Sequence, residues 1–217
     1  MSRRGLFISF EGGEGAGKST VMSAAGTVLA QAGIAHRVTR EPGGSALGEA
    51  LRALVLDPRH AGTCREAEVL MMFAARAQHV VETIEPALAA GQWVVSDRFT
   101  DASFAYQGGG RGLSTEILQQ LESWAAFGLR PDRTFLLDVP VPEGMRRVAS
   151  RGGEADRMER ESAAFFERVR AAYLARAQAD PQRFRVIDAT QPLAGVLAAV
   201  EDELGALLGH WRAGVGA

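Results

Sequence analysis

The chain has 217 residues, of which 47% are hydrophobic and 23% are charged, and its formal net charge is −2. This composition is typical of one folded globular domain with a large core, and the lack of excess positive charge argues against nonspecific binding of nucleic acid. The single cysteine, Cys64, excludes a disulfide framework and a cysteine metal site. Since we see neither a secretory signal nor a membrane-spanning apolar run, we expect a cytoplasmic protein with no membrane or nucleic-acid partner.

The chain alternates strand-like and helix-like segments. Short apolar runs predict strands, and apolar residues at helical spacing predict helices. In chain order we predict a strand at 6–10, a helix at 21–33, a strand at 34–40, helices at 45–56 and 65–90, a strand at 92–97, a helix at 114–126, a strand at 133–139, helices at 142–150 and 159–179, a strand at 183–189 and a helix at 193–208. Such repeats indicate an α/β fold, a doubly wound five-stranded parallel sheet with helices on both faces. We expect residues 1–217 to form a single domain.

A glycine-rich segment follows the first predicted strand. Residues 12–19 fit the pattern G-x-x-x-x-G-K-[ST] between a strand and a helix, which is the context of a phosphate-binding loop. Glycines let backbone amides approach an anion, the helix N-terminus adds positive charge, and Lys18 supplies a point charge for the outer phosphates. The alternative is a glycine turn that merely starts a helix. The predicted ATP-binding residues are Gly12, Gly13, Glu14, Gly15, Ala16, Gly17, Lys18, Ser19 and Thr20.

An acidic residue and an arginine follow the third predicted strand. Asp97 after an apolar run is typical of the acid that helps to hold Mg²⁺, and the Ser19 hydroxyl is the second predicted ligand. Asp97 could instead cap a helix or a turn. Arg98 would point its guanidinium fork into the same cleft and hold the phosphate of an acceptor, the alternative being a surface arginine.

We predict a loop at 99–112, where aromatic residues, amides and glycines are mixed. The ring of Tyr106 and the amide of Gln107 are suitable for contacting a base and its sugar. Tyr106 could equally belong to the core.

Five arginines surround Gly152 and Gly153 in a segment that we predict to be a short lid at about 146–160. Phosphoryl transfer spreads negative charge over the equatorial oxygens, so cations that close over the phosphoryl group are the main catalytic tool. Closure also excludes water. The alternative is a solvated, charged hinge. The arginines of this segment are Arg146, Arg147, Arg151, Arg157 and Arg160.

The sequence resembles the thymidylate kinase family over nearly its whole length. The segments FISFEGGEGAGKST, TREPGG, FAARAQH, SDRFTDASFAYQGGGRG and ADRMERE carry the resemblance, in that order. It implies a P-loop NTPase fold of the nucleoside monophosphate kinase type and an ATP:dTMP phosphotransferase that makes dTDP for dTTP biosynthesis. It also implies Mg²⁺ as cofactor, ATP and dTMP as the bound partners, and a homodimer packed through helices, for which the predicted helix at 65–90 is a candidate face.

The resemblance implies roles for individual residues. Glu14 and Glu41 match acidic residues near the acceptor, Glu14 at its sugar hydroxyl. Arg98 matches the arginine that holds the dTMP phosphate, which Arg52 could also reach. The residues matching the thymidine contacts are Arg76, Ser103 and Gln107 for the base and Tyr106 for the deoxyribose.

In the family, the phenylalanine that stacks on thymine often lies four residues before the arginine at Arg76. Here that position is Met72, and Phe73 lies three residues before Arg76. Since both spacings face the arginine on a helix, we choose Phe73.

The phosphate loop carries no arginine, because Gly15 and Ala16 stand where other members have one. The resemblance is therefore to the bacterial type, which supplies the catalytic arginine from the lid. Arg151 and Arg157 are the leading candidates, and with Lys18, Arg98 and Glu14 they complete the predicted catalytic set.

Two other functions remain open at the level of sequence. Another P-loop kinase, acting on a different nucleotide or a deoxynucleoside, would use the same chemistry with another acceptor pocket. A nucleotide-dependent switch or regulatory ATPase is the second alternative. A GTPase switch would carry an N-K-x-D segment, which is absent from the sequence, and this reading leaves Arg98 and the segment after it without a role.

Overall fold

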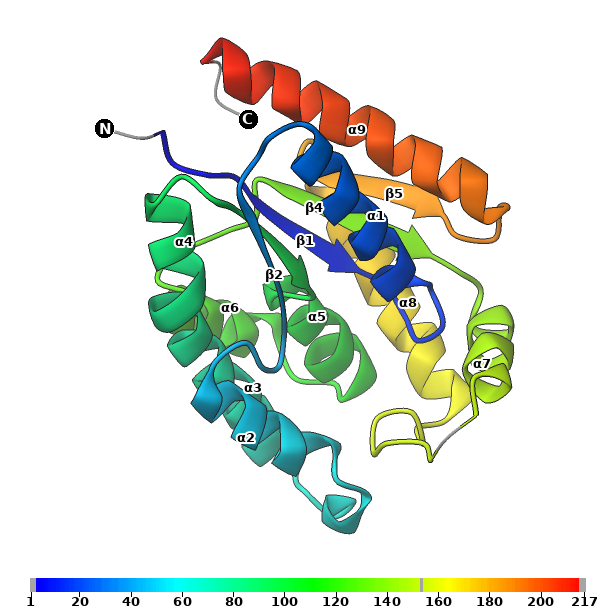
Figure 1. The fold of residues 1–217 in the computed structure, drawn as a ribbon. Helices are drawn as coiled ribbons and strands as arrows, with labels where there is room; N and C mark the ends of the chain where they lie inside the picture. Colours follow the sequence, from blue (N-terminus) through cyan, green and yellow to red (C-terminus); the bar gives the residue numbers. More distant parts are fainter. Residues whose placement is uncertain (1–2, 153, 215–217) are drawn as a thin grey trace.

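The computed structural model describes residues 3–152 and 154–214. Its centre is a parallel sheet of five strands in the order β2-β3-β1-β4-β5. Every adjacent pair in this sheet is parallel (Figure 1). The strands are β1 Phe7–Glu11, β2 His36–Arg40, β3 Trp93–Asp97, β4 Arg133–Asp138 and β5 Phe184–Asp188. The predicted α/β fold with five parallel strands is thus confirmed.

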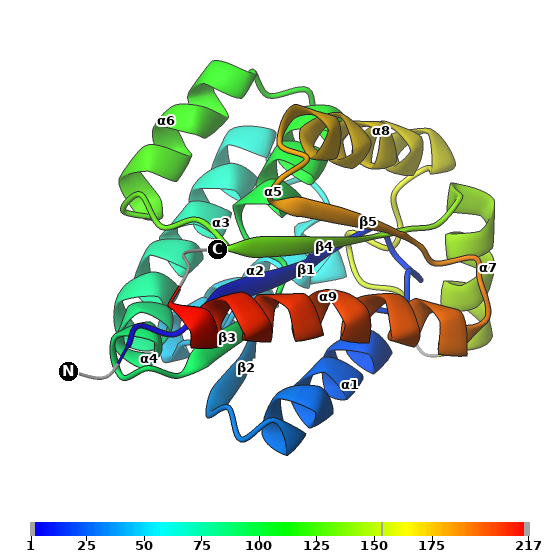
Figure 2. The same cartoon turned by 90° about the horizontal axis from the view of Figure 1, so that it is seen from above.

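Helices cover both faces of the sheet. Figure 2 shows α1 and α9 on one face and α5 and α8 on the other. The helices of the described residues are α1 Lys18–Gln31, α2 Ala46–Leu56, α3 Arg65–His79, α4 Glu85–Ala89, α5 Thr100–Ser103, α6 Thr115–Ala125, α7 Val141–Ser150, α8 Ala163–Ala179 and α9 Leu193–Ala213, with a 3-10 turn η1 Pro58–His60 and π-helical segments η2 Val80–Ile84 and η3 Phe104–Gly110.

The central strand β1 divides its side chains between the two faces, as strand geometry requires. Ile8 and Phe10 pack in a large core with Leu29 of α1 and Leu204 of α9. Phe7 points the other way into a smaller core formed largely with η2, α4 and β3. A strand buried on both faces explains why its sequence is apolar without a polar alternation.

The predicted helix at 65–90 is helical throughout, but it is not one regular α-helix. The π-helical segment η2 joins α3 to α4. The helix predicted from residue 159 begins only at Ala163, because the Ser162 side chain caps its amide end by accepting from the Phe165 N–H. The last helix continues past 208 to Ala213 and ends at Gly214, which has a φ of 81°.

The prediction of a loop at 99–112 is wrong, because α5 and η3 make most of this segment helical. Two of its glycines serve close packing against α8. A Cβ on Gly110 would lie 2.4 Å from the Phe165 ring, and one on Gly109 would lie 2.7 Å from the Cβ of Ala172. Gly109 and Gly110 therefore mark the close approach of two helices.

Residues from four segments meet at the carboxyl ends of the strands. The glycine-rich segment follows β1, Glu41 follows β2, Arg98 follows β3, and the lid segment lies beyond β4 and α7. A cleft is expected at this edge in a doubly wound sheet. No helix of the described residues is long and apolar enough to cross a membrane.

Candidate active site

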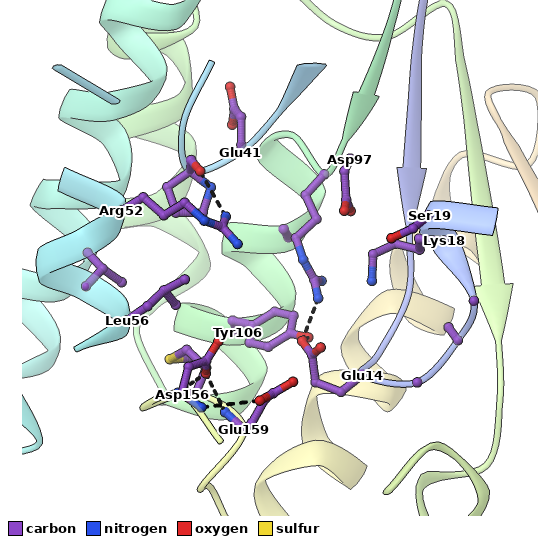
Figure 3. A pocket seen from close by; sticks show the side chains of 18 of the residues that line it. Glu14, Lys18, Ser19, Glu41, Arg52, Leu56, Asp97, Tyr106, Asp156 and Glu159 are labelled. Atoms are coloured by element: carbon purple, nitrogen blue, oxygen red, sulfur yellow. Dashed lines mark hydrogen bonds and ion pairs between the residues drawn. The ribbon is translucent and has the colours of Figure 1, made fainter. Parts of the chain in front are cut away.

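A cavity of about 530 Å³ lies at the carboxyl ends of β1 and β3. Figure 3 shows Lys18, Ser19 and Asp97 near one another, with Arg52 and Glu41 on the far side and Asp156 and Glu159 from the lid segment below. The residues that line the cavity are Glu14, Gly15, Ala16, Gly17, Lys18, Ser19, Thr20, Glu41, Pro42, Arg52, Val55, Leu56, Met72, Asp97, Arg98, Ala102, Tyr106, Gln107, Arg147, Arg151, Asp156, Met158 and Glu159.

The glycine-rich segment folds back over β1 and leads into α1. Gly12, Gly15 and Gly17 all have positive φ angles, at 141°, 72° and 89°. Gly12 also passes so close to β4 that a Cβ would lie 2.5 Å from the carbonyl oxygen of Leu137. Glycine is the residue that adopts this conformation without a steric penalty. The path of the loop therefore depends on its glycines.

Lys18 begins α1 and is buried beneath the loop. Its ammonium group donates weakly to the carbonyl oxygens of Gly12 and Gly13, at 3.3 and 3.5 Å. Burial and the nearby guanidinium of Arg98 lower its pKa, while Asp97 and Glu14 oppose that shift. A charged amine at this position has few partners within the protein, which suits it to an anionic ligand.

Arg98 lies across the opening of the loop. It donates Nη1 to the Gly12 carbonyl at 3.0 Å and Nη2 to Glu14 Oε1 at 2.6 Å, and its guanidinium lies 4.7 Å from the centre of the Tyr106 ring. Its φ of 70° is unusual for a residue with a side chain. Strained backbone of this kind persists only where surrounding contacts hold it, and such positions cluster at functional sites.

Glu14 is the carboxylate that pairs with Arg98. It also accepts a hydrogen bond from the Tyr106 hydroxyl at 2.8 Å. Burial would raise the pKa of Glu14, but the charges of Arg98 and Lys18 and the hydroxyl of Tyr106 outweigh burial and lower it to about 2. The carboxylate is therefore ionised at neutral pH and cannot itself act as a proton donor.

Glu41 forms a buried group with α3. It accepts from Arg76 Nε at 2.7 Å and contacts His79 Nδ1 at 2.9 Å. Arg76 also donates to the Ser103 hydroxyl and to the Phe99 carbonyl, both at 3.0 Å. Glu41 lines the cavity. Arg76 and Ser103, which the resemblance assigns to the base, are buried and do not line it. Arg76 instead holds Glu41 in position, and Ser103 accepts from Arg76.

The comparisons with known proteins decide the family. A sequence profile described as thymidylate kinase matches residues 10–200. The chain belongs to the thymidylate kinase family. It is 55% identical to a thymidylate kinase from Halorhodospira halophila over 88% of this chain and 90% of that protein. It is 51% identical to one from Alkalilimnicola ehrlichii over 97% of each. A crystal structure of the Ehrlichia chaffeensis thymidylate kinase has a TM-score of 0.73 at 31% identity, covering 93% of this chain and 99% of that one.

The predicted P-loop NTPase fold follows from this membership, and most of the predicted site residues meet in the cleft. The loop residues from Glu14 to Thr20 line it, together with Glu41, Arg52, Asp97, Arg98, Tyr106 and Gln107. Arg52 donates to the Pro42 carbonyl at 3.0 Å. Gly12 and Gly13 do not line it, but their carbonyls contact the Lys18 ammonium.

The choice of Phe73 over Met72 does not fit the structure. Met72 lines the cavity, whereas Phe73 is only 3% exposed and packs in a core with Val69, Phe104 and Leu118. The Arg76 guanidinium lies 4.6 Å from the Phe73 ring, so the ring supports Arg76 from the core side. Two adjacent residues on a helix point about 100° apart, and this rotation places Met72 toward the cleft.

The lid arginines divide into two groups. Arg147 and Arg151 line the cavity, and Arg151 pairs with Glu159 at 3.2 Å. Arg157 does not line it: this residue is 5% exposed and donates Nη2 to the buried Glu68 at 2.6 Å. Arg151 is therefore the predicted catalytic arginine that lies at the cleft, whereas Arg157 attaches the lid to α3 through Glu68. Gly153, half of the predicted glycine pair, lies outside the described residues.

Two residues that sequence reasoning missed lie beneath Arg98. Glu11 ends β1 and accepts from the Phe99 N–H and the Tyr173 hydroxyl, each at 2.7 Å. Burial and the nearby Asp101 raise the pKa of Glu11 to about 8 despite Arg98. A carboxyl at the end of an apolar strand was the available signal for Glu11. Nothing in the sequence linked Tyr173 to it across 162 residues.

The side chains between the loop and β3 carry oxygen donors of the kind that a magnesium ion takes. The Ser19 hydroxyl and the Asp97 carboxylate line the same end of the cavity, and Asp97 Oδ1 is buried without a hydrogen-bond partner among the described residues. Hard oxygen ligands are those that Mg²⁺ prefers, and it usually takes one or two protein ligands plus phosphates and water. The described residues contain no cluster of three or more acidic, histidine or cysteine side chains able to hold a metal alone.

We predict that Glu14→Gln lowers the free energy of unfolding by about 2 kcal/mol at pH 7, because it removes the ionised partner of Arg98. The folded-state pKa of Glu14 is depressed, so its contribution is fully present above the unfolded pKa, near 4.5, and is lost as pH falls toward 2. Urea unfolding of both proteins from pH 8 to pH 3 measures the difference. The difference should be constant above pH 6 and shrink below about pH 4.5. A difference that stays constant down to pH 3 would contradict the assigned pKa.

Proposed function

We propose that the chain transfers the γ-phosphoryl group of ATP in line to dTMP, giving ADP and dTDP, as a step of dTTP biosynthesis. One observation carries this proposal: a single cavity has the phosphate loop with Lys18 at one side and Arg98 beside it, next to a pocket containing Gln107. Two phosphorylated ligands can therefore meet with their phosphates between two cations. The family membership of the chain supports the same reaction.

The loop side of the cavity binds ATP. Backbone amides of residues 12–20 and the N-terminus of α1 bind the phosphates, and Lys18 neutralises charge that develops on the γ-phosphoryl group. Ser19 and Asp97 would hold Mg²⁺, directly or through water. When bound, that ion supplies charge neutralisation between the phosphates of ATP.

The opposite side binds dTMP. Arg98 takes the acceptor phosphate, with Arg52 on the same wall, and Tyr106 places its ring against the sugar. Gln107 contacts the base, and Met72 supplies the apolar surface on which the base packs. Glu14 and Arg76 act mainly by positioning Arg98 and Glu41. No general base is needed, because the attacking phosphate oxygen is already anionic.

The lid supplies the remaining cation. Arg151 lies at the wall of the cavity, and Arg147 approaches the loop from α7, donating to the Gly15 carbonyl at 3.5 Å. We propose that Arg151 neutralises the equatorial oxygens in the transition state, while the lid at about 146–160 keeps water from attacking ATP. We also propose that residues 1–217 form one nucleoside monophosphate kinase domain, which works in the cytoplasm.

A homodimer is proposed through the outer faces of α3 and α6. Leu70, Ala74 and Val81 are exposed at helical spacing along α3 and η2, and Ile117 and Trp124 are exposed along the adjacent α6. Trp124 is 78% exposed. Two neighbouring apolar stripes of this kind are typical of a protein–protein interface, and the self-complementary contact of a dimer would bury them.

The acceptor is tested by coupled measurement of ADP release with dTMP, dUMP, dCMP, AMP and thymidine. We expect the highest kcat/KM with dTMP and at least a hundredfold lower value with AMP and thymidine, because the proposed base contacts suit a pyrimidine and thymidine lacks the phosphate that Arg98 is proposed to hold. If another compound is the best acceptor, the chain is a P-loop kinase of that compound and the proposal of dTMP as acceptor is wrong. Steady ATP hydrolysis that no acceptor changes would instead favour a regulatory ATPase.

Arg98→Ala should raise the KM for dTMP at least about tenfold and leave the KM for ATP within about threefold, because the cation is directed to the acceptor phosphate. Initial-rate kinetics with each substrate varied in turn give both constants. Arg37→Ala is the matched control, since it removes an exposed cation of β2 remote from the cleft. If the KM for ATP rises as much as that for dTMP, Arg98 does not belong to the acceptor site.

Trp124→Glu should convert the dimer into a monomer, because a charge in the centre of an apolar interface is left unpaired and desolvated. Sedimentation velocity at micromolar concentration measures the change. Leu193→Glu is the control, since Leu193 is an exposed leucine on α9, away from α3 and α6. A variant that stays dimeric would place the dimer interface elsewhere. A monomeric wild-type protein would refute the proposed dimer.

A further inference from the structure

A carboxylate behind the acceptor pocket joins three segments of the chain. Glu68 of α3 is fully buried and does not line the cavity. It accepts from Gln107 Nε2 at 2.9 Å, from Arg111 at 3.2 Å through two nitrogens, and from Arg157 Nη2 at 2.6 Å. These partners belong to η3, to the residue after it and to the lid. Glu68 thus accepts hydrogen bonds both from η3, which is proposed to contact the base, and from the lid, which is proposed to cover the phosphates.

Glu68 is ionised in this environment. Burial would raise its pKa, but the amide of Gln107 and the guanidinium groups of Arg111 and Arg157 outweigh burial and lower it. An ionised carboxylate can only accept hydrogen bonds. The amide of Gln107 must therefore turn its nitrogen toward Glu68, and the opposite orientation would set oxygen against oxygen.

This orientation determines what Gln107 offers to a ligand. With one Nε2 hydrogen bonded to Glu68, the amide oxygen Oε1 lies on the side away from that carboxylate, and Oε1 is buried without a hydrogen-bond partner among the described residues. Gln107 also lines the acceptor side of the cavity. A buried acceptor without a partner costs free energy, which a ligand carrying an N–H group would recover.

We infer that Glu68 is the positioning residue that sets base specificity: it fixes Gln107 with its amide oxygen toward the cleft and so selects a pyrimidine that carries hydrogen on N3. Thymine and uracil have this N3–H donor. Cytosine presents a lone pair at N3, which would face the lone pairs of Oε1. The inference rests on the proposed function, because it requires that this part of the cavity holds the base of the acceptor.

Glu68 also has a structural role that the test must separate from specificity. Arg157, its lid partner, donates Nε to the Val55 carbonyl at 2.6 Å and its backbone N–H to the Leu56 carbonyl at 2.9 Å. Glu68 therefore helps to fasten the lid to the end of α2. Loosening the lid would change turnover with every acceptor equally, whereas turning the Gln107 amide changes the ratio between acceptors.

The test is Glu68→Gln, assayed with dTMP and dCMP. The glutamine amide both donates and accepts, so it permits either orientation of Gln107. We expect the ratio of kcat/KM for dTMP to that for dCMP to fall at least about tenfold, chiefly through a higher KM for dTMP. Glu66→Gln is the matched control, because it removes an exposed carboxylate two residues away on the same helix and should leave the ratio unchanged.

A methyl probe gives an independent readout. The 3-methyl derivative of dTMP lacks the N3–H donor, so we expect the wild-type enzyme to use it at least about a hundredfold less well than dTMP, and Glu68→Gln to narrow this gap. A folded Glu68→Gln protein with wild-type ratios for both acceptor pairs would overturn the inference. If Glu68→Gln does not fold, Glu68→Asp withdraws the carboxylate by one methylene and keeps its charge. It should lower the ratios in the same direction, and unchanged ratios would again overturn the inference.

Failure of the proposed function would look different. In that case the wild-type enzyme itself would not prefer dTMP to dCMP. A wild-type preference for dTMP that survives loss of the Glu68 carboxylate would refute only the role assigned to Glu68.

Discussion

The contact between Arg98 and the phosphate loop is the constraint that fixes the acceptor side of the cleft against the loop. One guanidinium group bonds the Gly12 carbonyl and the Glu14 carboxylate and lies over the Tyr106 ring. It thereby joins β3 and η3 to the loop after β1. The strand order makes this contact feasible, because β3 lies directly beside β1 and brings Asp97 level with Phe10. A partly buried cation also requires compensating charge, and Glu14 provides it.

The kinds of cation in the cleft match their tasks. Lys18 is the only lysine in the sequence, and its compact point charge suits the role proposed for it among several phosphate oxygens. Every other basic side chain that lines the cavity is an arginine. A planar guanidinium can bind a phosphate in two places and can also pack on an aromatic ring, as Arg98 does on Tyr106. Replacing arginine by lysine in this cleft is therefore not a conservative change.

Sequence reasoning predicted those parts of the molecule that local patterns determine. The strands, the phosphate loop and the helical character of residues 65–89 follow from periodicity and from one specific motif. It failed where the outcome depends on a partner far along the chain. The glycine-rich segment at 99–112 was predicted to be a loop, yet it is largely helical, and Gly109 and Gly110 allow α8 to approach. Met72 and Phe73 lie four and three residues before Arg76 on α3, so helical spacing alone does not distinguish them, and only tertiary packing shows which side chain faces the cleft. In a run of five arginines, charge alone did not reveal that Arg157 reaches a buried carboxylate on α3.

The positions of three carboxylates explain how a cleft lined by cations keeps one arrangement. Glu14 holds Arg98, Glu41 holds Arg76, and Glu68 holds Gln107 together with Arg157. Buried ion pairs add little net stability, because desolvation cancels much of their attraction, but an unpaired buried charge is costly. Each carboxylate therefore excludes alternative orientations of its partner more than it strengthens the fold. The cost of misorientation, rather than the gain from pairing, therefore keeps the guanidinium groups and the Gln107 amide in the orientations on which the proposed binding of phosphates and base depends.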